Sequence, residues 1–317
     1  MTEIGIFLSS EEHDGTALVR FARQAEEAGF RRLWVSDHFH PWIGAQGHAP
    51  FVWCVVGGIA ATTELAVTTA VTCPTFRVHP AIVAHAAATA ARMLPGRFAL
   101  GVGSGEALNE RVLGQHWPPA PVRLEMLAEA VELMRELWTG KLVTWRGEHY
   151  TVEGARIFTR PDGDIPVLIS ATGPKAMDLV ASHGDGWITT GLDDGLMAKF
   201  RAEGRGPAAI GVKVCWAEDE AAARRLAHAR WPNSLLPGQL NVELPQPSHF
   251  EAATADVTED DVAGVIACGP DPERHAAAIR PCLEAGFDEV YVSQIGPDQA
   301  GFLDFYRTEL APRLGTG

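Results

Sequence analysis

One short pattern, repeated at opposite ends of the chain, constrains the fold more than any other feature of the sequence. Residues 25–36 (AEEAGFRRLWVS) and residues 283–293 (LEAGFDEVYVS) each end an amphipathic helix at a glycine and continue into an apolar run, and residues 182–190 repeat the pattern more loosely. The glycine stands where a helix would close with a left-handed residue before a strand begins. Repeated helix–glycine–strand units predict parallel strands joined by right-handed crossovers.

Strand-like runs recur along the whole chain, with helical stretches between most of them. About eight runs qualify: Glu3–Leu8, Arg32–Ser36, Ala66–Val71, Arg97–Val102, Pro166–Ser170, Gly186–Thr190, Ala209–Cys215 and Glu289–Ser293. This number fits a closed barrel, and the two chain ends carry nearly the same unit, so a (β/α)8 TIM barrel is favoured over an open α/β sheet. The 317 residues could hold two domains, but no linker divides them, so we expect one domain over residues 1–317.

The segments between the strands carry their own signals. His79-Pro80 begins a helix that we expect to run through Ala81–Met93. Arg123–Trp138 has apolar residues at helical spacing, which we interpret as core packing, and Lys141–Ile157 alternates like a hairpin. Residues 232–260 are rich in Pro, Gln and Asn with weak periodicity. They predict a long inserted loop that acts as a lid or as part of a substrate pocket.

The composition excludes some partners. A formal net charge of −14 argues against nucleic acid or an anionic membrane as a partner. No apolar stretch approaches the ~18 residues of a membrane span, and the N-terminus lacks the basic region of a secretory signal. The expected location is therefore the cytoplasm. Five cysteines without CxxC spacing indicate reduced thiols rather than a disulfide framework or a zinc ribbon.

A chemically rich stretch follows the second expected strand. Residues 36–42 (SDHFHPW) place two imidazoles, a carboxylate and an indole where the apolar run Leu33–Val35 ends. Groups that titrate near neutrality at the carboxyl end of a strand are typical of an α/β active site. The plainer interpretation is a surface loop that happens to be rich in histidine. We favour the site, because a proline fixes the turn and other strand ends supply polar partners.

Polar residues follow at least five other expected strands, and loops at the carboxyl ends of barrel strands share one rim. They are Ser9–His13, Thr72–Arg77, Gly101–Glu106 with Asn109 and Glu110, Ala171–Lys175, and Thr190 with Gly191. Gly101–Gly105 reads GxGxG rather than GxGxxG, so it is a weak dinucleotide signal. Close approach of the backbone to a flat cofactor, with Glu106 projecting into the site, explains it better. Gly173-Pro174 begins a helix, and this helix N-terminus is either an anion-binding site or an ordinary helix start.

The pair of His38 and His40 also suggests a metal site, since metal-dependent hydrolase barrels carry an HxH pair. Those barrels need further ligands at later strand ends, usually another His and an Asp. The later strand ends here offer Thr190, Gln294 and Cys215 instead. We therefore expect no bound metal.

Several motifs together resemble the luciferase-like TIM-barrel superfamily and, within it, the branch that uses the deazaflavin coenzyme F420. The resemblance is closest to the F420-dependent glucose-6-phosphate dehydrogenase group and spans nearly the whole chain, most weakly from about Gly195 to Asp261. The motifs are residues 36–42, GHAPF at 47–51, CPTFR at 73–77, GSGEALNE at 103–110, FLD at 302–304 and LAPRL at 310–314. The resemblance implies coenzyme F420 as cofactor, an alcohol or sugar as small-molecule substrate, and a homodimer.

The resemblance also implies a role for each matching position. His38 matches the family's catalytic base, which removes the alcohol proton as hydride leaves for the deazaflavin, and Glu106 matches the carboxylate proposed to protonate the reduced cofactor. Trp42 and Glu11 match residues around the reacting centre. The implied cofactor-binding residues are Asp37, Ala70, Val71, Cys73, Ser104, Gly105, Asn109, Thr172, Gly173, Ala176 and Thr190. In the family, the positions of Ala70 and Val71 form a bulge with a non-proline cis peptide behind the deazaflavin ring, and Cys73 replaces a usual Thr.

The substrate end departs from the group. The sugar-phosphate dehydrogenases hold phosphate with two lysines and an arginine, whereas the matching positions here are Leu192 or Asp193, a residue near Asn241, and Gly264. None is cationic, so a phosphate dianion would be poorly held on so acidic a chain. We expect a neutral alcohol or a non-phosphorylated sugar rather than glucose 6-phosphate, and either direction of hydride transfer is compatible with the sequence.

Three other interpretations stay open. The first is an FMN-dependent luciferase-like monooxygenase, although Asp37-His38 and GEALNE at 105–110 favour the deazaflavin. The others are a metal-dependent hydrolase on a similar barrel and a barrel that binds a flavin without catalysis. His40 is expected at the pocket rim, because the family's base lies two residues earlier.

Overall fold

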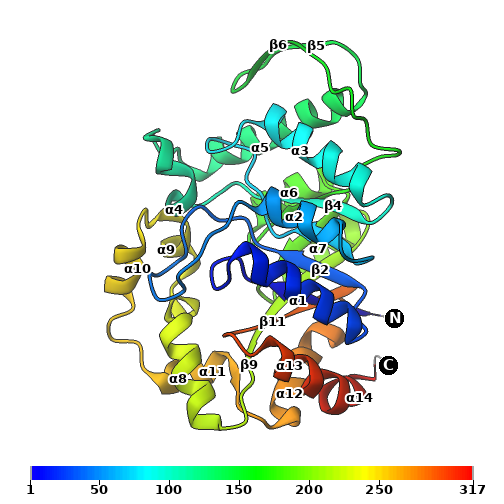
Figure 1. Cartoon of the computed structure of the whole chain (residues 1–317). Coiled ribbons are helices and arrows are strands. Elements are labelled where there is room, and N and C mark those ends of the chain that lie inside the picture. The colour runs from blue at the N-terminus through cyan, green and yellow to red at the C-terminus, as the bar shows by residue number, and fades with distance from the viewer. Residues whose placement is uncertain (1, 316–317) are drawn as a thin grey trace.

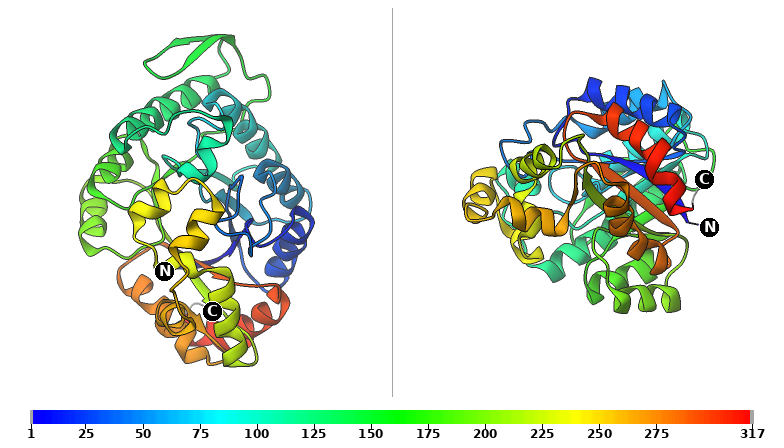
Figure 2. Two further views of the ribbon diagram at one scale, coloured as in Figure 1. Left: turned by 90° about the vertical axis from the view of Figure 1, so that its left-hand side faces the viewer. Right: turned by 90° about the horizontal axis from the view of Figure 1, so that it is seen from below.

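The computed structural model describes residues 2–315 as a barrel of parallel strands surrounded by helices (Figures 1 and 2). The barrel sheet contains β1 (Glu3–Leu8), β2 (Arg32–Val35), β3 (Ala66–Thr69), β4 (Phe98–Val102), β7 (Val167–Ser170), β8 (Gly186–Thr189), β9 (Ala208–Cys215), β10 (Ala267–Cys268) and β11 (Glu289–Gln294). Its order is β10-β9-β11-β1-β2-β3-β4-β7-β8, and an additional pairing of β9 with β8 closes the ring. The expected (β/α)8 barrel is confirmed, and each of the expected runs contributes a strand.

Strand β9 has two partners on one side. Its first residues, Ala208–Ile210, pair with β8, and its last two, Val214 and Cys215, pair with the short strand β10, while β11 runs along its other side. Because β8 ends beside Ile210 in the middle of β9, the carboxyl end of β9 extends beyond the end of β8. It leads into the segment that carries α8.

Helices pack around the strands in the left view of Figure 2, which looks along the barrel. They are α1 (Gly15–Glu27), α2 (Val52–Ala60), α3 (Pro80–Met93), α5 (Ala120–Trp138), α6 (Pro174–His183), α7 (Asp194–Glu203), α8 (Glu220–Arg230), α12 (Pro272–Glu284), α13 (Gln299–Phe305) and α14 (Ala311–Leu314). The predicted helix after His79-Pro80 is α3, and His79 caps it by accepting a hydrogen bond from the Ala81 N–H at 3.1 Å. The helix predicted over Arg123–Trp138 is α5, which begins three residues earlier than predicted.

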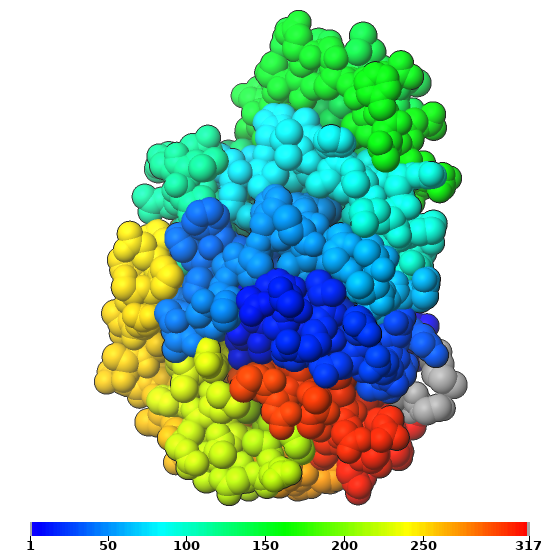
Figure 3. Space-filling model, in the orientation of Figure 1, coloured from blue at the N-terminus to red at the C-terminus, as the bar shows by residue number. Residues whose placement is uncertain are grey.

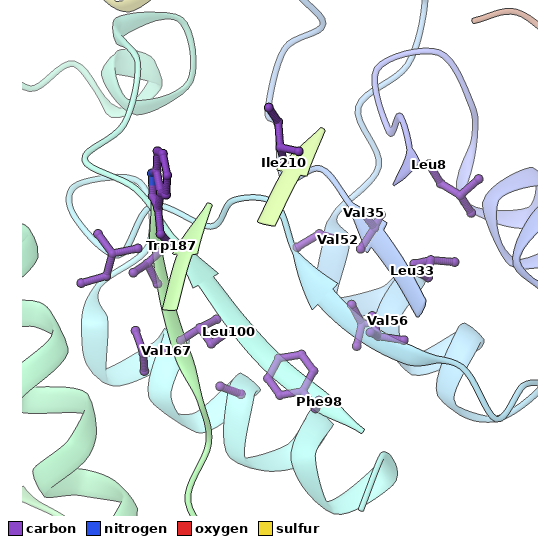
Figure 4. Close-up of a cluster of buried hydrophobic side chains, with 14 of the residues drawn as sticks. Leu8, Leu33, Val35, Val52, Val56, Phe98, Leu100, Val167, Trp187 and Ile210 are labelled. Carbon is purple, nitrogen blue, oxygen red and sulfur yellow. The ribbon is translucent and has the colours of Figure 1, made fainter. Parts of the chain in front are cut away.

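Two apolar layers hold the barrel together. Strand residues that point outward, such as Leu33, Leu100 and Val167, pack against the helices (Figure 4). Inside the barrel, the rings of Trp34 and Tyr291 stack with centroids 4.1 Å apart. This interior is a packed core, stabilised by ~25 cal/mol for each Å² of apolar surface removed from water. The polar side chains of the candidate site therefore lie at the ends of the strands.

The glycines of the repeated units behave differently from one another. Gly29 and Gly286 have φ values of 101° and 83°, so both close their helices in the left-handed region, as predicted. The prediction is wrong for Gly184, whose φ of −84° is ordinary. A Cβ there would lie 2.8 Å from the carbonyl oxygen of Val180 in the last turn of α6, so crowding at the end of its own helix explains this glycine instead.

Two excursions leave the barrel. The predicted hairpin is β5 (Val143–Arg146) paired with β6 (Thr151–Ala155), and it stands out from the body of the molecule (Figures 1 and 3). The prediction of an irregular loop over residues 232–260 is wrong. That segment folds into the 3-10 helix η2 (Pro232–Leu235), α9 (Gly238–Glu243), α10 (Pro247–Ala253) and the start of α11 (Glu259–Val265).

Among residues 2–315, no helix is long and apolar enough to span a membrane.

Candidate active site

Glu11 and His38 form a buried pair at the carboxyl ends of two neighbouring strands. Glu11 follows β1 and His38 follows β2, which pairs with β1 in parallel. His38 Nε2 lies 3.3 Å from Glu11 Oε1, and the hydroxyls of Ser9 and Ser36 donate to Glu11 Oε2 at 2.7 and 2.6 Å. Burial raises the pKa of Glu11, but His38 and these hydroxyls outweigh it and bring the pKa below its ordinary value. Glu11 therefore faces the imidazole as an anion.

Asn109 fixes the loop that carries His38. It lies in α4 (Ala107–Glu110), and its Oδ1 accepts hydrogen bonds from the backbone N–H groups of Phe39 at 2.8 Å and His40 at 3.1 Å. This leaves Nδ2 as the donor end of the amide. Nδ2 lies 3.1 Å from His38 Nδ1 and 3.4 Å from Glu106 Oε2. Both ends of the buried Asn109 side chain are thus engaged by the protein.

The imidazole of His38 is supported in each of its protonation states. Its Nδ1 has two neighbours at 3.1 Å, the His40 carbonyl oxygen and Asn109 Nδ2. When Nδ1 carries a proton it donates to the carbonyl, and when it does not it accepts from the amide. In the doubly protonated ring, Nε2–H faces the Glu11 carboxylate. The His40 ring itself is held by the Leu108 carbonyl oxygen, 3.0 Å from its Nδ1.

Trp42 links the imidazole to the 232–260 segment. Its ring centroid lies 4.9 Å from that of His38 and 5.3 Å from that of Phe250 in α10, which meets it edge-on. The backbone N–H of Trp42 donates to Gln46 Oε1 at 2.8 Å, and Gln46 Nε2 donates to the Arg230 carbonyl at 2.9 Å. Figure 2 (left) shows the segment in yellow across this end of the barrel. It therefore helps to hold the wall beside His38.

Asp37 belongs to a buried ionic network. Its two carboxylate oxygens accept from Arg77 Nη2 at 2.9 Å and from the Thr72 hydroxyl at 2.8 Å. The same guanidinium contacts Glu110 Oε1 through Nε at 3.4 Å, and Glu110 Oε2 accepts from the Thr75 hydroxyl at 3.0 Å. Burial lowers the pKa of Arg77, but the two carboxylates outweigh it and raise the pKa. The network ties the loops after β2, β3 and β4 together.

The predicted residues on β4 and its loop lie beside this network. Glu106 precedes α4, is partly accessible, and contacts Asn109 as described. Ser104 and Gly105 are also partly accessible, and Gly105 has a φ of 88°. Cys73 is buried, and burial, together with Glu106 and Glu110, raises the pKa of its thiol well above the ordinary value. Cys73 is therefore a neutral thiol.

The remaining predicted positions follow β3, β7 and β8. The peptide bond between Ala70 and Val71 is cis, as the resemblance implied. Thr172 and Thr190 are exposed after β7 and β8, and Gly173 and Ala176 are half-buried at the start of α6. In the described part of the chain, no hydrogen bond joins them to Glu11, His38 or Asn109. The structure thus joins one group of predicted residues by hydrogen bonds, and Thr172, Gly173, Ala176 and Thr190 are not part of that group.

Three neighbours of the pair were not singled out from the sequence. Glu12 accepts from the Trp231 indole N–H at 2.5 Å and from the Gly296 N–H at 2.8 Å, and burial raises its pKa to about 7. Lys213, on β9, lies with Nζ 4.3 Å from the centroid of the Trp231 ring. Alternation along β9 could have placed Lys213 on the inner face. No local signal in the sequence could have linked Trp231 with Glu12.

The two histidines of the HxH pair have protein partners of other kinds. His38 faces Glu11, Asn109 and a carbonyl, and His40 faces the Leu108 carbonyl. Across residues 2–315, no group of three or more His, Cys, Asp and Glu side chains is gathered in a way that could hold a metal ion.

The fold and this site define a barrel enzyme class in which a carboxylate–imidazole pair lies at the ends of adjacent strands. The chain belongs to the luciferase-like monooxygenase family, which it matches over residues 1–289. It is 38% identical to an F420-dependent glucose-6-phosphate dehydrogenase of Rhodococcus hoagii, over 98% of this chain and 97% of that protein. It is 34% identical to an F420-dependent hydroxymycolic acid dehydrogenase of Mycobacterium tuberculosis, over 98% and 88%.

A solved structure is similar over the whole chain. It is an F420-dependent secondary alcohol dehydrogenase in complex with an F420-acetone adduct, 32% identical, with a TM-score of 0.89 and 99% of each chain covered. The similarity of the fold therefore extends to the inserted segment as well as the barrel.

Proposed function

We propose that this protein is a coenzyme F420-dependent oxidoreductase that transfers hydride between the deazaflavin and a neutral alcohol or non-phosphorylated sugar. The observation that carries the proposal is the buried His38–Glu11 pair, with 3.3 Å between Nε2 and Oε1. Such a pair moves a proton to or from a hydroxyl as hydride moves. The similar proteins are dehydrogenases named for the same cofactor.

The rim fits a flat, anionic cofactor. A Cβ at Gly101 would lie 1.9 Å from the Thr69 carbonyl oxygen, and one at Gly103 would lie 2.7 Å from the Val71 side chain. The ends of β3 and β4 therefore offer a wall without room for further side chains, suited to a ring. The N-terminus of α6, with Gly173 as N-cap, offers free N–H groups and a positive dipole end for phosphate. When bound, the deazaflavin supplies the hydride acceptor or donor.

His38 is the proposed base. In the tautomer with a proton on Nδ1, donated to the His40 carbonyl, Nε2 is unprotonated and can take the alcohol proton. The resulting imidazolium faces Glu11, whose negative charge is held by the hydroxyls of Ser9 and Ser36. The buried anion therefore stabilises the product state of the proton transfer. In the reverse direction the same ring returns the proton to a carbonyl oxygen.

Asn109 acts through His38 and the loop that carries it. The resemblance implied a role in cofactor binding, whereas its hydrogen bonds run to Phe39, His40, His38 and Glu106. We therefore assign it to positioning the base. Glu106 is the carboxylate proposed to face the cofactor, since it is partly accessible and contacts the same Asn109 Nδ2 group that lies beside His38.

The substrate part of the proposal rests on charge. Asp193 is the N-cap of α7, Asn241 Nδ2 donates to the Leu236 carbonyl in the inserted segment, and Gly264 lies within α11. None of these positions brings a cation to the site. A phosphate dianion would lack the paired cations that usually hold it. The proposal therefore excludes glucose 6-phosphate as the preferred substrate.

The test is a fluorescence titration of the purified protein with F420 and, separately, with FMN, followed by turnover with alcohols and sugars. We expect tight binding of F420, weak binding of FMN, and a loss of turnover on the order of 100-fold or more in His38→Ala. His85→Ala, an exposed residue of α3, is the matched control and should leave turnover unchanged. A preference for FMN would make the protein a monooxygenase or flavin reductase and refute the proposal.

The proposal also covers location and assembly. We propose a cytoplasmic homodimer, in accord with the family resemblance. Sedimentation of the purified protein would give twice the mass of the 34.1 kDa chain. A monomer at micromolar concentration would contradict this part alone.

A further inference from the structure

Lys213 is the one lysine of the chain that lies on a barrel strand. The chain has only four lysines, Lys141, Lys175, Lys199 and Lys213. Ala209 belongs to the interior cluster with Trp34, and a Cβ on Gly211 would lie 3.3 Å from the Trp34 ring. Successive residues of a strand alternate between its faces. Lys213 therefore lies on the inner face of β9, one layer nearer the carboxyl end, where His38 and Glu11 also lie.

The ammonium group of Lys213 is held near carboxylates without being paired. Its Nζ lies over the Trp231 ring at 4.3 Å from the centroid, and the Trp231 indole N–H donates to Glu12. Within residues 2–315, no hydrogen bond or ion pair to Nζ is formed. Burial lowers the pKa of Lys213, although the charges of Glu11 and Glu12 oppose this. Its three N–H bonds are therefore available to a ligand inside the barrel mouth.

The charges around Lys213 restrict what it can bind. Glu11 is an anion, and Glu12 carries negative charge above its pKa of about 7. An anionic ligand brought to Lys213 would meet both carboxylates, and the single ammonium would not balance three negative charges. A neutral oxygen with a lone pair meets no such repulsion. Ser293 is paired with Lys213 across β9 and β11, so its hydroxyl adds a neutral polar group to the same layer of the barrel.

We propose that Lys213 is a substrate-binding residue that donates a hydrogen bond from Nζ to a substrate hydroxyl other than the one that His38 deprotonates. The site therefore selects diols, polyols and sugars over alcohols with a single hydroxyl. This inference rests on the proposed function, whose site it completes. It names the substrate class through a residue that lies outside the motifs of the family resemblance.

The kinetic test compares 2-propanol, propane-1,2-diol and glycerol in F420-dependent turnover. In Lys213→Met, which keeps an unbranched apolar chain over Trp231, kcat/KM for glycerol should fall at least about tenfold more than kcat/KM for 2-propanol. The extra loss should lie mainly in KM. Lys213→Gln, which retains an N–H donor without the charge, should recover part of the loss. Lys199→Met changes a half-buried lysine of α7 that is paired with Asp178; it is the matched control and should behave as the wild type.

A second measurement does not depend on turnover. With only four lysines in the chain, 15N-labelled lysine gives few side-chain resonances, and Lys213→Met identifies the one from Lys213. In the wild-type protein, glycerol should shift this resonance, and 2-propanol at the same concentration should shift it less. This readout also keeps the inference testable if Lys213→Met folds poorly.

The outcomes separate the two hypotheses. Equal losses for glycerol and 2-propanol in Lys213→Met, or a Lys213 resonance that glycerol does not move, would overturn the substrate-binding role and leave Lys213 as a structural counter-charge. A glycerol-dependent shift in a protein that turns over no alcohol or sugar with F420 would support the subsite and refute the proposed oxidoreductase.

Discussion

Replacing Asn109 with alanine separates a positioning role from a cofactor-binding role. The substitution removes two hydrogen bonds to the backbone of the His38 loop, at 2.8 and 3.1 Å, and the amide contact to His38 Nδ1 at 3.1 Å. At about 0.5–1.5 kcal/mol for each of these three bonds, the free energy of unfolding should fall by about 1.5–4.5 kcal/mol. The lower figure is expected, because Phe39 is exposed and water can reach its N–H group.

The effect on catalysis should be larger than the effect on binding. A correctly placed base contributes about 10²–10⁴ in rate, so we expect the single-turnover rate of hydride transfer to fall about 100-fold. The dissociation constant of F420 should change by less than about threefold, which is under 1 kcal/mol. Stopped-flow absorbance of the deazaflavin measures the rate, fluorescence titration measures the affinity, and urea unfolding measures the stability.

Asn109→Asp is the matched variant. Its carboxylate still accepts from both backbone N–H groups, but toward His38 Nδ1 it offers an acceptor instead of a donor. The loop should stay in place, so the rate should recover at least about tenfold relative to Asn109→Ala. The reasoning is refuted if Asn109→Ala weakens F420 binding by as much as it slows hydride transfer, because Asn109 would then act on the cofactor.

Three further predictions concern stability and the inserted segment. Arg77→Met leaves two buried carboxylates without their partner, so urea unfolding should show a loss of about 3–5 kcal/mol, and a loss under about 1 kcal/mol would contradict the network. Phe250→Ala removes the ring that packs on Trp42, so KM for the alcohol should rise while F420 affinity stays constant; an unchanged KM would argue against α10 as part of the pocket wall. Glu12 has a pKa of about 7 when folded against about 4.3 unfolded, so the folded chain retains a proton that the unfolded chain loses. The free energy of unfolding should therefore fall by about 3 kcal/mol as pH rises from about 4 to above 7. Unfolding at pH 5 and pH 8 should show a smaller difference for Glu12→Gln than for the wild type. The same difference in both proteins would show that another group is responsible.

The barrel could be predicted because its signals are local and repeated. The glycines at 29 and 286 close helices with φ values near those of left-handed residues, and each strand carries its own apolar run. The 232–260 segment lacks such signals, since its helices are short and their packing is long-range. Phe250 is buried against Trp42 and Leu108, which lie far away in the sequence. Weak periodicity therefore concealed helices that tertiary contacts stabilise.

The position of the site could be predicted from the sequence, but the hydrogen bonds and ion pairs between its side chains could not. Strand ends of a barrel meet at one rim, so polar residues after β1, β2 and β4 were expected together. Which atoms meet depends on side-chain direction, which residue order does not give. The resemblance predicted that Asp37 binds the cofactor, but it gave no sign that the two Asp37 oxygens accept from Arg77 and Thr72. Lys213 escaped notice because a single lysine in an apolar strand carries no motif.

Adjacent carboxylates with opposite pKa shifts indicate how the site divides its tasks. Glu11 and Glu12 are both buried, but Glu11 accepts from two hydroxyls and faces His38, which lowers its pKa, whereas burial dominates at Glu12 and raises its pKa to about 7. Environments that separate the pKa values of neighbouring acids usually separate their roles. In the proposed mechanism, Glu11 is thus the constant anion that stabilises the imidazolium. Glu12 changes charge near neutral pH beside Trp231 and Lys213, so the pH of the medium would set the charge next to the proposed Lys213 subsite rather than next to the proposed base.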